Sequence, residues 1–266
     1  MNTKLTRWMI LGLLFIPTAP RAAARQSAAN TPPALSPRDM RVEKAKILMA
    51  EKRFEACIEA YQDLLKSEPK NAVFMNMIGI AYLDLSNPDQ AKRYFQRSEK
   101  ADKKYSSAVN NLGMVYYTQK NYRRAIREYQ RAVVIDPSQA GTHANLGFAY
   151  YNTNKFPEAS TEFQKALEID PHVFERNSSV GTMMQDRSVS NHGLFFFTMA
   201  RVYAQKKDAE HCAEYLRKSF DEGYKDLVKV KTDPAFKDVL NDPGVQAVLV
   251  LITPPDQKDA TTQPGA

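Results

Sequence analysis

The chain has 266 residues, 43% of them hydrophobic and 25% charged, so it can bury a continuous core and is neither a fibrous nor a disordered polymer. Its formal net charge is +7, and because the first 24 residues carry three basic residues and no acid, their removal would leave +4. A charge this small does not indicate nucleic-acid binding, and we expect no nucleic acid as a partner.

The N-terminal segment has the layout of a secretory signal peptide. Lys4 and Arg7 precede an apolar run at 8–16, which gives way to small residues up to Ala24. That run is about half the length that spans a bilayer, and neither cysteine lies near Ala24 to carry a lipid. We expect a cleaved signal peptide at residues 1–24, against the alternative of an uncleaved anchor, and a periplasmic or secreted mature chain without stable membrane insertion.

A sequence repeat begins after residues 25–37, which are rich in alanine, serine and proline and are expected to form a disordered linker. Gly79, Gly113 and Gly147 follow one another at a constant interval of 34 positions, and a tyrosine lies three positions after each of them. Three further sets of positions recur at the same interval: Ala91, Ala125 and Ala159; Phe95, Tyr129 and Phe163; and Ser98, Ala132 and Ala166. An earlier unit has Ala45 and Cys57 in the same register. A fixed period of this size indicates stacked supersecondary units, and we place four of them at 38–173.

Each unit is predicted to be a pair of amphipathic helices. Leu112 and Tyr116 are spaced as on one helical face, and Ala125 and Tyr129 are spaced as on a second. A glycine inside a helix costs up to about 1 kcal/mol relative to alanine, so Gly113 needs a packing reason. We expect it to admit a backbone or an aromatic ring from the partner helix.

The period breaks after the fourth unit. Residues 174–192 are expected to form an inserted loop or hairpin, 193–223 a divergent fifth repeat, 224–252 a helical cap and 253–266 a disordered tail. Asp-Pro pairs at 136–137, 170–171, 233–234 and 242–243 place a capping side chain before a proline. They predict that a helix begins at each proline.

These residues resemble the tetratricopeptide repeats, whose pattern is leucine-glycine, tyrosine, alanine, aromatic, alanine and proline at fixed offsets in a unit of about 34 residues. The third unit matches throughout, with Leu112, Gly113, Tyr116, Ala125, Tyr129, Ala132 and Pro137, and the fourth unit matches equally well. The second unit has Lys103 where the proline falls. The resemblance implies an all-α fold, a right-handed α-solenoid of about five helix-turn-helix repeats with a C-terminal helical cap.

The resemblance also implies a binding groove lined by the free face of the first helix of each repeat. Its candidate peptide-binding residues are Asn76, Asn110, Asn111, Met114, Tyr117, Asn145, Phe148 and Tyr151, with Ile80 and Asn152 beside them. An asparagine can donate to and accept from a peptide backbone, and aromatic and methionine side chains hold apolar groups. In the alternative, the aromatic rings pack between repeats and the asparagines only cap or face water.

One subfamily of these repeats binds the terminal carboxylate of a peptide with lysine and arginine on the same inner face. This chain departs from that pattern, because it has Asn110, Asn111, Ala144 and Asn145 there. A chaperone C-terminus is therefore not an expected ligand.

No catalytic residue, metal site or cofactor is predicted. Cys57 and Cys212 occupy the alanine-like position of two distant repeats and are expected to be buried free thiols. The histidines, His143, His172, His192 and His211, show no metal-ligand spacing and are expected to be surface or packing residues.

One basic stripe stands out, formed by Lys120, Arg123, Arg124, Arg127 and Arg131. It could meet an acidic partner or anionic lipid, or it could be a solvated outer face.

The sequence favours a non-catalytic adaptor of the cell envelope that holds a protein or peptide ligand in its groove. The alternative is a structural subunit of an envelope or secretion assembly that uses its convex face or cap. The sequence leaves open whether the chain forms homo-oligomers. A hydrolase acting on envelope polymers is a weaker hypothesis, because no paired catalytic groups are evident.

Overall fold

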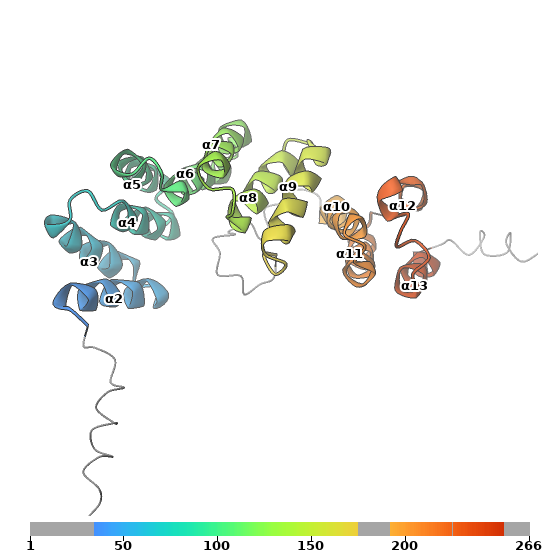
Figure 1. The fold of residues 1–266 in the computed structure, drawn as a ribbon, viewed down its shortest axis with the longest axis horizontal. Helices are drawn as coiled ribbons and strands as arrows, with labels where there is room; N and C mark the ends of the chain where they lie inside the picture. The colour runs from blue at the N-terminus through green and yellow to red at the C-terminus, as the bar shows by residue number, and fades with distance from the viewer. Residues whose placement is uncertain (1–34, 175–191, 225, 253–266) are drawn as a thin grey trace, which may run out of the picture. The chain divides into compact units, whose positions relative to one another are not determined.

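The computed structural model describes residues 35–174, 192–224 and 226–252. The expected signal peptide, most of the expected linker, all of the expected insertion except Phe174 and His192, and the expected tail lie outside these residues. The described residues from Arg41 onward belong to one compact unit. Every regular element in the described residues is a helix (Figure 1), which confirms the predicted all-α fold.

Five helix pairs follow one another along the chain. The first helices of the pairs are α2 (Pro37–Ala50), α4 (Ala72–Asp84), α6 (Ser106–Thr118), α8 (Ala140–Tyr151) and α10 (His192–Gln205). The second helices are α3 (Phe54–Ser67), α5 (Pro88–Ala101), α7 (Tyr122–Ile135), α9 (Phe156–Ile169) and α11 (Ala209–Asp221). From α3 to α11, each helix packs against the next one along the chain, and α9 packs against α10 although residues 175–191 separate them in the sequence. This consecutive packing is the solenoid arrangement that the period predicted.

The turn inside each pair has the same backbone conformation. The turn residues with positive φ are Lys52, Ser86, Lys120, Asn154 and Lys207, with values between 57° and 60°, and the first four keep the interval of the repeat. In the third pair, the backbone N–H of Asn121 donates to the Tyr116 carbonyl and that of Lys120 donates to the Tyr117 carbonyl, both at 2.8 Å. These bonds end α6 in a left-handed cap, which sends the chain back along the helix it has just left.

An aromatic ring packs on a glycine inside three of the pairs. A Cβ atom on Gly79 would lie 2.5 Å from the ring of Phe95, and one on Gly147 would lie 2.5 Å from the ring of Phe163. Gly113 forms the third such contact. The expectation that these glycines admit a ring from the partner helix is confirmed.

Buried serines hold the helices of two pairs together. The hydroxyl of Ser98 donates to the carbonyl of Ala72, and that of Ser219 donates to the carbonyl of Gly193, both at 2.7 Å. Both serines are fully buried. Alanine occupies the equivalent position in the third and fourth repeats. A small side chain is therefore common to the second, third, fourth and fifth repeats, whereas the hydrogen bond forms only in the two repeats that have serine.

The Asp-Pro predictions succeed in the cap and fail in the repeats. The 3₁₀ helix η3 (Pro234–Phe236) and α13 (Pro243–Ile252) begin at their prolines. In contrast, α8 begins three residues after Pro137, and residues 171–174 form a turn. Asp136 ends α7 and its carboxylate accepts hydrogen bonds from the Ser138 N–H at 3.0 Å and the Ser138 hydroxyl at 2.7 Å. Its acceptor atoms are therefore used in a turn and not in a helix cap.

The C-terminal elements pack on the fifth repeat. A short helix, α12 (Leu227–Thr232), precedes the two elements that the sequence predicted. Arg201 on α10 donates to Asp233 at 2.7 Å, and the rings of Phe197 and Phe236 lie 5.6 Å apart. Helix α13 packs against α11. Among the described residues, no helix combines the length and the apolar character needed to cross a membrane.

Candidate functional site

The eight predicted groove residues all lie on α4, α6 and α8. Two of these helices are buried on most of their circumference: eleven residues of α6 and eleven of α8 are buried. Asn71 begins α4 by accepting a hydrogen bond from the Phe74 N–H at 3.1 Å, whereas Tyr105 and Gln139 precede α6 and α8 without a side-chain cap. Helices of this kind are held by packing on both neighbours more than by their own termini.

Four of the predicted residues, Asn76, Asn110, Asn111 and Asn145, form a continuous chain of hydrogen bonds, here called the asparagine ladder. The Asn111 amide donates to Asn76 at 2.9 Å, the Asn110 amide donates to Asn111 at 3.2 Å, and the Asn145 amide donates to Asn110 at 3.1 Å. The ladder thus joins α4 to α6 and α6 to α8. Its side chains stabilise the stacking of three repeats.

The two ends of the ladder differ. At one end, the Asn76 amide lies 3.5 Å from the hydroxyl of Tyr105, a long hydrogen bond. Burial raises the pKa of the Tyr105 phenol, and its hydrogen bonds with Ser107 and Asn76 oppose that rise. At the other end, the side-chain carbonyl oxygen of Asn145 is buried and has no partner among the described residues. The ladder therefore ends on an unsatisfied acceptor.

The aromatic candidates pack into the protein. Tyr117 accepts a hydrogen bond from the Asn152 amide at 2.6 Å and meets the ring of Tyr122 edge-on at 5.0 Å. Phe148 lies 5.1 Å from Phe163 and 5.4 Å from Phe195, measured between ring centroids. Phe195 also packs against Tyr151.

The expectation that these eight residues are presented on a free face is wrong. Their exposed fractions are all 8% or less; the set is Asn76, Asn110, Asn111, Met114, Tyr117, Asn145, Phe148 and Tyr151. The physical reason is that their side chains reach the neighbouring repeat, as the asparagine ladder and the Phe148–Phe195 contact show. Their role in ligand binding stays a prediction.

A buried charged cluster in the fourth repeat was not predicted. Nδ1 of His143 on α8 lies 2.6 Å from a carboxylate oxygen of Glu162 on α9, and Nε2 lies 3.0 Å from the Pro137 carbonyl. The Lys165 amine donates to the other Glu162 oxygen at 2.9 Å. Both imidazole nitrogens face acceptors, which a doubly protonated ring satisfies.

The pKa shifts agree with this geometry. The Glu162 hydrogen bond raises the pKa of His143, and burial opposes the rise without cancelling it. Burial acts to raise the pKa of Glu162, but the hydrogen bonds from His143 and Lys165 outweigh it and lower that pKa. Little in the sequence signals this pair, because its members lie 19 residues apart on different helices.

The described residues form a depression beside the third repeat. This open depression of about 470 Å³ lies at the turn between α6 and α7, and its lining includes Lys120, Arg123 and Thr153 but no carboxylate. Among the described residues, no group of three histidine, cysteine, aspartate or glutamate side chains could hold a metal ion.

Three family models match the chain. Residues 113–154 match a model described as TPR repeat, and residues 140–173 match one described as tetratricopeptide repeat. A further tetratricopeptide-repeat model matches 39–71 and 72–105. No curated protein matches the chain.

Several solved structures resemble the chain over most of their length at low sequence identity. PilF of Pseudomonas aeruginosa is 16% identical with a TM-score of 0.51, over 79% of this chain and 88% of its own. MamA is 20% identical with a TM-score of 0.47, over 67% and 93%. YrrB, described as a TPR protein with an unusual peptide-binding site, is 19% identical with a TM-score of 0.45, over 79% and 95%.

Sequence identities this low indicate a similar fold and nothing more. The assignment of the repeats to a family therefore rests on the family models. They match the residues where the glycine, alanine and aromatic columns repeat. The matches at 39–71, 72–105 and 140–173 each correspond to one helix pair, and the match at 113–154 runs from the middle of α6 to the end of α8. Residues 39–105 and 113–173 of the chain are tetratricopeptide repeats.

Proposed function

We propose that the chain is an exported adaptor of the cell envelope that binds a protein or peptide along the first helices of its repeats and performs no catalysis. Tetratricopeptide repeats are protein-interaction modules, and this supports the general part of the proposal. A stacked helical array offers a preformed surface, so little conformational entropy is lost on binding.

The observation that carries the location of the binding face is the unsatisfied end of the asparagine ladder. A buried acceptor without a donor costs about 1–3 kcal/mol. A partner that brings a backbone N–H or a hydroxyl to the Asn145 oxygen would recover this cost. Since Asn145 is fully buried, the partner must displace neighbouring side chains, and α8 should change its hydrogen exchange on binding.

The binding face can be tested with a pull-down from envelope extract, using the chain from Arg25 onward as bait. An Asn145→Ala variant keeps the other two ladder bonds, and an Asn241→Ala variant, altered at an exposed position in the cap, is the matched control. We expect the first variant to lose a partner that the native chain and the control both retain. Unfolding curves of all three baits separate loss of binding from loss of structure.

Capture of the same partners by all three baits would count against the first-helix face. It would leave the alternative that the chain is a structural subunit acting through its outer face or its cap.

Export requires a separate measurement. Fractionation of cells that produce the full chain should place a shortened product outside the cytoplasm, with its N-terminus near residue 25. A full-length product in the cytoplasm would refute the envelope assignment and leave the protein-binding proposal standing.

A further inference from the structure

The positive charge of this protein is concentrated in one part of the chain. Between residues 88 and 135 there are eleven lysines and arginines against four acidic residues, an excess of seven. The whole chain has 37 basic and 30 acidic residues, the same excess. The remainder of the chain is therefore neutral overall, and the field around the protein is centred on α5, α6 and α7.

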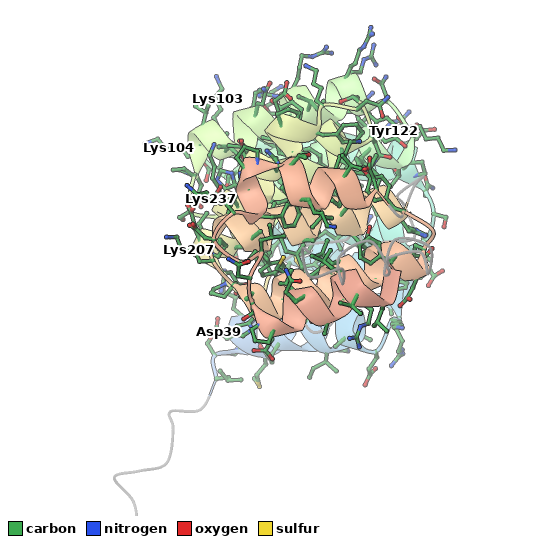
Figure 2. The ribbon with its side chains drawn as sticks, turned by 90° about the vertical axis from the view of Figure 1, so that its right-hand side faces the viewer. Asp39, Lys103, Lys104, Tyr122, Lys207 and Lys237 are labelled. Carbon is green, nitrogen blue, oxygen red and sulfur yellow. The ribbon has the colours of Figure 1, made fainter. Side chains whose placement is uncertain are left out.

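The outer sides of α5 and α7 carry the exposed part of this charge. Six arginines are exposed on these two helices, and five of them are here called the arginine face: Arg93, Arg97, Arg123, Arg127 and Arg131. On α7 they recur every four residues, which places them in one stripe along the helix. Arg93 and Arg97 precede Arg127 and Arg131 by one repeat, so two neighbouring repeats present the same pair. Lys103 and Lys104, in the turn that follows α5, also project outward (Figure 2).

One member of the arginine face already binds carboxylates. The Arg131 guanidinium forms ion pairs with Glu128 on its own helix and with Glu99 on α5. The second pair shows that a guanidinium on α7 reaches a carboxylate on α5. Guanidinium groups are strong hydrogen-bond donors to carboxylates.

Three other members have no such partner. The guanidinium groups of Arg93, Arg123 and Arg127 form no ion pair or hydrogen bond with any described residue. The guanidinium carbon of Arg97 lies over the ring of Tyr94, 4.8 Å from its centroid. The arginine face thus offers exposed positive charge, and three of its guanidinium groups have donors that are not used by described residues.

From this arrangement we propose that the arginine face is a second docking surface, and that its occupant is an acidic protein segment, helical when bound, with carboxylates about four residues apart. That spacing matches Arg123 and Arg127 along α7 and Arg93 and Arg97 along α5. The arginine face shares no residue with the asparagine ladder. The two proposals can therefore be tested independently of each other.

A membrane surface and a nucleic acid fit the face less well. Basic helices that bind membranes usually add large apolar and aromatic side chains, whereas the outer stripe of α7 exposes only Val134 among its large apolar residues. For a nucleic acid, the excess charge of the whole chain is small, and the ion pairs of Arg131 show carboxylate recognition directly.

Fluorescence anisotropy of a labelled 21-residue peptide tests the proposal. The peptide is helical and carries glutamate at every fourth position, and a second peptide of the same composition has its glutamates clustered at one end. The full chain is compared with an Arg93→Gln/Arg123→Gln/Arg127→Gln variant. A Lys70→Gln/Lys231→Gln/Lys237→Gln variant loses the same charge at exposed positions elsewhere and is the matched control. Thermal unfolding verifies that both variants remain folded.

The native chain should bind the spaced peptide more tightly than the clustered one, and more weakly as salt is raised. The arginine variant should bind the spaced peptide at least tenfold more weakly, and the control variant less than threefold more weakly. Equal losses in both variants would mean that only net charge matters, which overturns the proposal. Tighter binding to phosphatidylglycerol vesicles or to a 20-base-pair DNA duplex than to the spaced peptide, lost in the arginine variant, would also overturn it.

Discussion

The ring of Tyr129 lies on the backbone of Gly113, so closely that a Cβ atom added to Gly113 would be 2.6 Å from Cε1 of the ring. Both residues belong to the third repeat, one on each helix, and Tyr129 is fully buried. The contact sets how closely α6 and α7 approach, because the ring has no room to move away.

A Gly113→Ala substitution should destabilise the protein by about 1–3 kcal/mol, since overpacking outweighs the better helix propensity of alanine. Urea unfolding monitored by circular dichroism measures the change. In a Tyr129→Leu background the same substitution should cost less, because the ring that it would meet is absent. An equal cost in both backgrounds would show that the Tyr129 ring is not the cause.

The hydroxyl of Tyr129 has no hydrogen-bond partner among the described residues, although it is buried. Burial raises the pKa of this phenol far above its ordinary value, with Tyr117 adding to the rise. The equivalent residues in the neighbouring repeats are Phe95 and Phe163. Tyr129→Phe should therefore leave the free energy of unfolding unchanged or raise it by up to about 1 kcal/mol. A clear loss of stability in the same urea measurement would mean that the hydroxyl has a partner.

The His143–Glu162 pair should make stability depend on pH. The pKa of His143 is raised above its ordinary value of 6.5, so its contribution is complete below about pH 6.5 and is lost as the pH rises through the folded-state pKa. The pKa of Glu162 is lowered from 4.5, so its contribution is complete above about pH 4.5 and is lost as the pH falls through the folded-state pKa. The pair therefore contributes most to the free energy of unfolding between about pH 4.5 and about pH 6.5.

A His143→Gln variant should lose about 1–3 kcal/mol at pH 5.5 and less at pH 9. His211→Gln, on the exposed side of α11, is the control and should change stability little at either pH. Urea unfolding at a series of pH values measures the effect. A His143→Gln cost that stays the same from pH 5.5 to pH 9 would show that the imidazole is not charged in the folded protein.

Cys57 and Cys212 are buried free thiols, as predicted. Burial raises the pKa of Cys57 to about 11 and that of Cys212 to about 12, with Asp208 and Asp242 adding to the second rise. Neither thiol should react with a thiol-specific disulfide reagent at pH 8 until the protein unfolds, when both should react. Rapid reaction of one thiol in the native protein would indicate local opening of its repeat.

Much of the fold followed from the sequence because tetratricopeptide packing depends on side-chain volume at fixed offsets. The columns of Gly113, Ala125 and Tyr129 are recognisable in the chain, and each has one packing role in its own pair of helices. The binding-face prediction had no such support. An asparagine side chain can cap a helix, face water or hydrogen-bond to a neighbouring helix. The residue type alone does not indicate which of these occurs.

The helix pairs, their order and the contacts inside each repeat can be predicted from the amino-acid sequence, since these contacts join residues whose sizes recur with the period. The packing of the repeats in three dimensions sets the asparagine bonds between repeats, because Asn76–Asn111 and Asn110–Asn145 are each offset by 35 residues, one more than the period. It also sets the ionic contact between His143 and Glu162 and the approach of Arg131 to Glu99. Those contacts depend on the rotation of one packed helix against another, which sequence spacing does not specify.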